Sequence, residues 1–166
     1  MELGEGLRLE VVEIEKPPEV NVIVGITHFI KSVEDIYEAV VNSVPGAKFG
    51  LAFVEASGKR LIRHDGTDEE MEELAIKNAL RIGAGHSFVL MLRNIYPINV
   101  INALRRVPEV VTLLAATANP LRVIVLDLGD SRAILGVADG GKPLGVEGKE
   151  DIEERKEFLR RIGYKR

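Results

Sequence analysis

The chain has 166 residues, of which 46% are hydrophobic and 29% are charged, and this makeup is that of one globular domain covering residues 1–166. It contains no cysteine, which excludes disulfides and thiolate metal sites and predicts an intracellular, cytoplasmic setting. A net charge of −4 gives no electrostatic basis for non-specific nucleic-acid binding, and the acidic first 15 residues contain neither a secretory signal nor a membrane span.

In the first half of the chain, apolar runs predict strands and two polar pairs predict helix starts. Ser32 with Asp35, and Thr67 with Glu70, have the spacing of capping boxes. A turn is expected at 64–66. The strands expected here are 7–15, 20–26, 49–55 and 60–63, and the helices are 32–43 and 67–82.

The second half continues with closely spaced strands between two helices. Pro97 suits the first turn of a short helix that ends before Pro108. The strands expected here are 87–92, 110–117, 122–127 and 132–138, and the last helix is 149–162. Helix crossovers together with closely spaced strands predict an α/β fold with one mixed β-sheet on which the helices pack.

Two glycine-rich segments resemble phosphate-binding loops but depart from them. Residues 136–143 approach a Walker A pattern, yet Pro143 stands where a magnesium-binding hydroxyl is needed and no helix start follows. Residues 83–88 run from a helix into a strand, the reverse of a dinucleotide-binding turn. A helix C-cap accounts for Gly83 and Gly85.

Two of the three histidines are candidates for phosphoryl chemistry. His28 lies between a buried strand and a helix start that can hold an anion, and Lys31 is close to it in sequence. His86 follows Gly85, which allows close backbone approach to a ligand. His28 could instead only hydrogen-bond its turn, and His86 could be a hydrogen-bonded residue at the entrance of a strand. His64 is expected to be solvated.

Carboxylate and amide side chains mark the ends of other strands and the start of the short helix. Glu55 and Asp139 end apolar strands, where a carboxylate can bind magnesium or accept a hydroxyl proton. Asn99, Thr117 and Asn119 are candidate ligand-binding residues, because buried polar groups need partners. Taken alone, Asn99 could equally pack against the next loop, and Asn119 could equally form a turn before Pro120.

Several segments occur in the order found in one protein family. They are His28–Lys31 with Val33–Asp35, Lys48–Phe53 with Glu55–Ser57, Gly83–His86, Pro97–Val100, Ala116–Pro120, Gly136–Gly140 and Arg161–Lys165. Together they span nearly the whole chain, which therefore resembles the adenosine-specific kinases, small archaeal and bacterial proteins. An archaeal or bacterial thermophile also suits a chain without glutamine but rich in Glu, Lys and Arg.

The resemblance implies a mixed α/β protein that binds adenosine, AMP or ADP, forms a homo-oligomer with a trimer favoured, and carries a phosphorylated histidine. That histidine is His28 or His86. In a kinase reaction ATP is the expected donor, with Mg²⁺ and a cation neutralising the phosphoryl oxygens.

Residue chemistry then suggests roles for the candidates. Lys31 is the phosphate-side cation, Asp139 or Glu55 a magnesium ligand or base, and the two asparagines orient the nucleoside. Because His86 precedes its strand, it can share a site with the strand-end residues only if that strand is antiparallel or a neighbouring subunit intervenes. The alternative function is a non-catalytic adenine-nucleotide sensor, since no intact phosphate loop is present.

Overall fold

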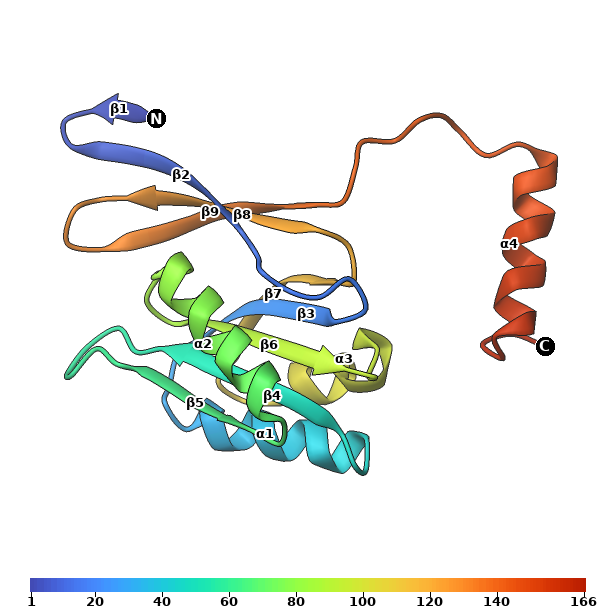
Figure 1. Ribbon diagram of the computed structural model, residues 1–166, viewed down its shortest axis with the longest axis horizontal. Helices are drawn as coiled ribbons and strands as arrows, with labels where there is room; N and C mark the ends of the chain where they lie inside the picture. The colour runs from blue at the N-terminus through green and yellow to red at the C-terminus, as the bar shows by residue number, and fades with distance from the viewer.

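Figure 1 shows the computed structural model of the protein, which describes residues 1–166. Its strands form two separate sheets. The strands are β1 (Glu2–Gly4), β2 (Leu7–Glu13), β3 (Asn21–Thr27), β4 (Lys48–Val54), β5 (Ile62–Gly66), β6 (Ser87–Arg93), β7 (Val110–Thr117), β8 (Leu121–Asp127) and β9 (Arg132–Asp139). The helices are α1 (Ser32–Ser43), α2 (Glu69–Ile82), α3 (Pro97–Arg105) and α4 (Lys149–Arg161).

The larger sheet has five strands in the order β5-β4-β6-β3-β7, and all its pairings are antiparallel. Strands β3 and β4 therefore run in the same direction, with β6 between them running the opposite way. The ends of β3 and β4 thus meet the beginnings of β5, β6 and β7. We call this end of the sheet the histidine end, because His28 and His86 lie there. We call the opposite end the asparagine end, because Asn99 and Asn119 lie there.

Two hydrophobic cores lie on the two faces of the five-stranded sheet. Helices α1 and α3 cover one face, where Ile36, Val40 and Leu104 pack with Phe49 and Leu90. The other face packs against α2 and against the four-stranded sheet β1-β2-β8-β9. Strands β3, β4 and β6 are buried almost throughout, which explains their unbroken apolar runs.

The expected α/β fold with helices packed on a sheet is confirmed, and so are most element positions. One detail was wrong: the strands form two antiparallel sheets in place of a single mixed one. The turn expected at 64–66 belongs to β5, where His64 pairs with Ala52. Close strand spacing is equally compatible with either arrangement, because direction depends on tertiary pairing.

Neither expected capping box forms. Helix α1 begins after Lys31, and α2 is capped by Asp68, which accepts a 3.1 Å hydrogen bond from Met71 N. The Thr67 hydroxyl instead donates to the Ala47 carbonyl at 2.5 Å and accepts from Phe49 N at 3.2 Å. Its side chain therefore ties the start of β4 to the end of β5.

Helix α4 stands apart from the rest of the molecule at the end of an extended segment (Figure 1). None of its residues is buried. No helix in residues 1–166 is both long enough and apolar enough to cross a membrane.

Candidate functional site

His28 and His86 flank a backbone hydrogen bond at the histidine end. Thr27 N donates to His86 O at 2.9 Å, and His28 N donates to the carbonyl of Glu109 at 3.1 Å. Because β6 is antiparallel to β3, the start of β6 adjoins the end of β3. This is the arrangement under which the two histidines can share a site within one chain.

The backbone of His86 adopts a conformation that is uncommon for a side chain other than glycine. Its φ is 67°, and its N–H donates to the Val54 carbonyl at 2.8 Å. The imidazole stacks on the buried ring of Phe53, with 5.9 Å between centroids. Such local strain is concentrated at functional sites.

Gly85 permits the close approach of the loop that carries His86. A Cβ added at Gly85 would lie 2.9 Å from the Cβ of Ala56, so any larger residue would push the loop away from the end of β4. The close neighbour of this glycine is therefore protein, and the approach of a ligand to His86 stays a prediction.

A buried polar network includes Thr27, which precedes His28, and Glu109, whose carbonyl accepts from His28 N. The hydroxyls of Thr27 and Ser32 are 2.5 Å apart, and Ser32 Oγ donates to Glu109 Oε2 at 3.1 Å. Thr27 and Ser32 are fully buried, and Glu109 is 5% exposed. Because Ser32 turns inward to this network, it is not available as a helix cap.

Lys31 connects the buried network to the surface. Its Nζ donates to Glu109 Oε1 at 3.1 Å and also bonds Asp35, one turn along α1. The hydrogen bond to Asp35, then that to Glu109, raises the pKa of Lys31 above its usual value. Lys31 is therefore a fixed cation, about half exposed and already bonded by two carboxylates, and its phosphate-side role stays a prediction.

Glu55, by contrast, is occupied within the fold. Its Oε2 accepts from Leu61 N at 3.0 Å, and both carboxylate oxygens accept from Arg63. The Leu61 hydrogen bond, followed by those from Arg63, lowers the pKa of Glu55. Its carboxylate fixes the β4–β5 connection, which leaves it poorly suited to the expected magnesium-binding or base role.

A hollow of about 740 Å³ opens beside the Gly85 loop at the histidine end. Its volume is in the range of small-molecule sites. The charged residues of its lining are Lys59, Arg60, Arg132, Glu55 and Asp130.

The cations that line this hollow differ in whether they are already bonded within the fold or are available to a ligand. Arg132 bonds the Glu10 carboxylate and the Arg81 carbonyl, the latter at 3.1 Å. Lys59 and Arg60 are exposed, and Glu55 is neutralised by Arg63. The hollow therefore presents two free cations at the end of the sheet where both histidines lie.

The remaining candidates lie at the asparagine end. Thr117 Oγ1 and Asn119 Nδ2 donate to Asp139 Oδ1 at 2.8 and 3.1 Å, and Asn119 N donates to Thr117 Oγ1 at 3.0 Å. Asn99 caps α3 by accepting from Tyr96 N at 3.0 Å. Since a strand of seven residues is about 20 Å long, these four residues and the histidines do not form one site within the chain.

The glycine segments have the structural roles that their sequence context favours. Gly83 caps α2 in the left-handed conformation, with φ 60°, and donates to the Ala79 carbonyl at 2.8 Å. Residues 136–139 belong to β9, and no helix begins until Lys149. The Walker A resemblance therefore does not produce a phosphate loop.

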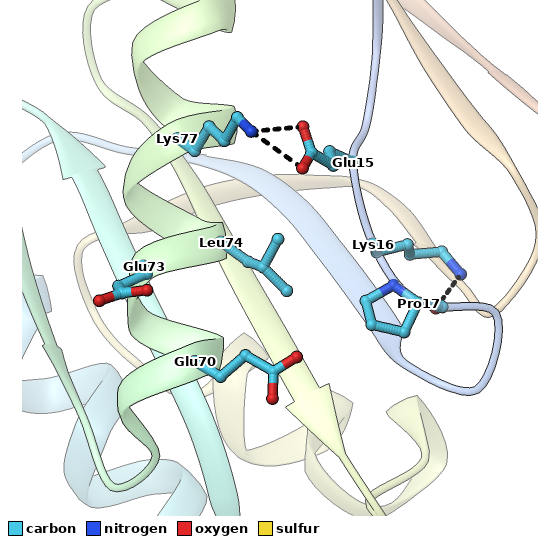
Figure 2. Close-up of a pocket in the computed structure, with 7 residues that line it drawn as sticks. All are labelled: Glu15, Lys16, Pro17, Glu70, Glu73, Leu74 and Lys77. Atoms are coloured by element: carbon cyan, nitrogen blue, oxygen red, sulfur yellow. Dashed lines mark hydrogen bonds and ion pairs between the residues drawn. The ribbon is translucent and has the colours of Figure 1, made fainter.

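A second hollow of about 470 Å³ lies between α2 and residues 15–17 (Figure 2). Lys77 reaches across it to Glu15, with Nζ 2.8 Å from Oε2, and Glu70 and Glu73 also line it. Its negative charges disfavour a phosphate ligand, and it contains none of the candidate residues. It is therefore not the candidate site.

Sequence reasoning missed several residues of the histidine end. Thr27, Ser32 and Glu109 form the buried network, and Lys59 and Arg60 line the hollow. Glu109 follows Pro108 and precedes a strand, so nothing local distinguishes it from a solvated turn residue. The adjacent cations Lys59 and Arg60, following the turn after Glu55, were a signal that could have been used.

Comparisons with known proteins bear on this arrangement. A family model described as adenosine specific kinase matches residues 12–165. The chain belongs to the adenosine-specific kinase family. The crystal structure of the PH1918 protein from Pyrococcus horikoshii OT3 is 45% identical in sequence, with a TM-score of 0.92 over 96% of this chain and 99% of that one. No curated protein matches the chain.

Proposed function

We propose that this member of the adenosine-specific kinase family transfers a phosphoryl group from ATP to adenosine at the histidine end of the five-stranded sheet. Family membership supports an adenosine-related, kinase-like function. The observation that carries the location is that the loop carrying His86 borders a cation-lined hollow through Gly85, at the end of the sheet where His28 also lies.

His86 is the proposed phosphoryl carrier. Its loop borders the hollow through Gly85, and its backbone is held in an uncommon conformation by hydrogen bonds to β3 and β4. His28 is more exposed and is stacked only on the half-exposed ring of Phe29. It suits the role of a base that receives a proton from the acceptor.

The reaction then proceeds in two balanced steps. A neutral imidazole nitrogen of His86 attacks the γ-phosphorus of ATP, so that an N–P bond forms, the bond to the β–γ bridging oxygen breaks and ADP leaves. A hydroxyl oxygen of adenosine next attacks the phosphohistidine, forming an O–P bond and breaking the N–P bond. The hydroxyl proton passes to His28, and the products are AMP and ADP.

Charge on the transferring phosphoryl group needs compensation from the protein. Lys59 and Arg60 in the hollow, and Lys31 beside His28, are the proposed cations. No three His, Asp or Glu side chains of the chain converge into a metal cluster. Magnesium bound through nucleotide phosphates needs only one or two carboxylates, and Asp130 is an exposed one in the hollow.

The second candidate function is a non-catalytic adenine-nucleotide sensor. The observation that favours it is the lack of a phosphate loop, because residues 140–148 are irregular where a helix N-terminus would have to begin. A sensor would bind adenine nucleotides at the same end of the sheet without forming AMP.

The test is AMP formation from adenosine and ATP by highly purified protein, together with phosphate incorporation from γ-labelled ATP. The proposal predicts turnover, a labelled histidine and loss of both in the His86→Asn variant. Asparagine is chosen because it tolerates positive φ better than alanine does. Tight nucleotide binding without AMP formation would favour the sensor, and turnover without any labelled protein would rule out the covalent step.

A further inference from the structure

The C-terminal residues 140–166, which we call the arm, are held away from the chain that carries them. The arm comprises an extended segment of nine residues and helix α4, and Figure 1 shows both apart from the two sheets. Leu144 and Val146 are almost fully exposed, and Phe158 is 48% exposed. Apolar residues in such number need a partner surface.

Helix α4 has the pattern of a helix that packs on one face. Ile152, Phe158, Leu159 and Ile162 lie on one stripe, while the opposite side carries charged residues such as Glu157. With 13 residues, the helix has a length at which isolated helices are only marginally stable in water. Its formation therefore calls for packing that its own chain does not supply.

The origin of the arm is fixed firmly, which argues against a loose tail. Asp139 accepts from Thr117 and Asn119, and Gly140 N donates to the Pro120 carbonyl at 3.0 Å. Gly140 has φ 64°, and a Cβ there would lie 3.1 Å from Asn119 Nδ2. The polar cluster at the asparagine end thus sets the direction in which the arm leaves.

The position of the arm away from the sheets also agrees with the structural similarity to the Pyrococcus protein. The arm is about one sixth of the chain, and a TM-score of 0.92 over 96% of it requires most of the arm to superpose as well. A protruding arm is therefore present in a crystal structure of a relative that is 45% identical.

The outer face of the four-stranded sheet is an apolar surface without a cover. Register places Leu9 beside Leu126 and Ala133, and Val11 beside Ile124. Val12, Val123 and Val137, on the opposite face, supply the core. Val11 is 56% exposed and the neighbouring Leu135 is 58% exposed, whereas an antiparallel sheet with a wet face normally turns polar residues outward.

We propose that the arm of one copy packs its apolar stripe on the outer face of the four-stranded sheet of a second copy. One chain carries both the unpartnered helix and the uncovered sheet, so the helix of one copy can cover the sheet of another. The nine-residue segment can span about 30 Å, which is enough to reach a neighbour. The contact joins two different surfaces and so builds either a reciprocal pair or a ring.

The first test of arm exchange compares the sedimentation mass of the parent protein with that of a variant altered in the arm. The full chain should sediment as an oligomer of its 18.3 kDa mass, and the double substitution F158E/I162E should convert it to monomer. Because both side chains are already exposed in the single chain, circular dichroism of the β-sheet region should be unchanged. A monomeric parent, or an oligomer that survives the double substitution, would overturn the proposal.

Cysteine cross-linking identifies the surface that receives the arm, since the chain has no cysteine of its own. Protein with Val11→Cys is mixed and re-equilibrated with protein carrying Phe158→Cys, and then oxidised. A disulfide between the two kinds of chain is expected, and the matched variant Glu157→Cys should give at least tenfold less. Equal cross-linking by Glu157→Cys, or a disulfide formed within single chains of V11C/F158C, would contradict arm exchange. Neither outcome depends on the proposed phosphoryl transfer.

Discussion

The backbone N–H of Thr27 donates to the carbonyl oxygen of His86 at 2.9 Å, and this bond joins the end of β3 to the start of β6. Through it, residues separated by almost 60 positions in the sequence become neighbours. The bond also places His28, which follows β3, and His86, which precedes β6, at the same end of the sheet. The proposed chemistry depends on this pairing.

Replacing the imidazole of His86 should abolish phosphoryl transfer while the fold is kept. His86→Asn is expected to lower the rate of AMP formation at least about 100-fold, as removal of a reacting side chain does. His64→Asn is the matched control, because His64 lies on β5 and pairs with Glu72 at 2.5 Å. Equal rates for the two variants, measured with thermal melting as a check on folding, would exclude His86.

Removing a cation from the hollow should weaken the binding of ATP more than that of adenosine. Lys59→Gln is expected to raise the dissociation constant of ATP about tenfold, the cost of one charged hydrogen bond. Lys48→Gln makes the same change in charge at the start of β4, at the asparagine end. Calorimetric titration of both variants checks this, and a similar loss in Lys48→Gln would point to general electrostatics.

Packing of α2 on β4 requires a glycine at position 50. A Cβ there would lie 2.1 Å from the backbone nitrogen of Glu72, so Gly50→Ala must displace the helix. We expect the free energy of unfolding to fall by about 1–3 kcal/mol in urea denaturation. Gly136→Ala, which meets no atom within 4 Å, should change it by much less. Similar effects at both positions would mean that α2 does not approach β4 this closely.

The pKa of Glu55 gives stability a dependence on pH. Its folded-state pKa lies below the usual 4.5, chiefly because Leu61 N–H and then Arg63 bond the carboxylate. The contribution is therefore complete above pH 4.5 and is lost as pH falls through the folded-state value. Glu55→Gln should lower the melting temperature at pH 7 and reduce its fall below pH 4.5. Parallel melting curves for parent and variant across this range would contradict the assignment.

Local patterns predicted most elements because buried strands and amphipathic helices are encoded by short-range spacing. They did not predict strand direction, since β3 and β6 are both apolar runs whichever way they pair. They also misassigned the role of Ser32. The Ser32 hydroxyl could bond either the start of the helix or Glu109, which is 77 positions away, and in the structure it bonds Glu109.

The candidate site was predicted only in part, because local patterns do not show which strand ends lie together. His28, Lys31 and His86 lie at one end because the antiparallel pairing of β3 with β6 brings the end of β3 beside the start of β6. Asn119 follows a strand with a similar local pattern, but β7 runs opposite to β3 and so brings Asn119 to the other end, where Asp139, the last residue of β9, accepts its hydrogen bond. A strand-end residue can be recognised locally, whereas its partners depend on the topology of the whole sheet.

A crystal structure of the protein soaked with adenosine and a non-hydrolysable ATP analogue tests the location of the chemistry most directly. We expect the phosphates to lie in the hollow against Lys59 and Arg60, with the γ-phosphorus facing His86. Nucleotide bound at Asn99 and Asn119 of a single chain, with the hollow at the histidine end left empty, would contradict it.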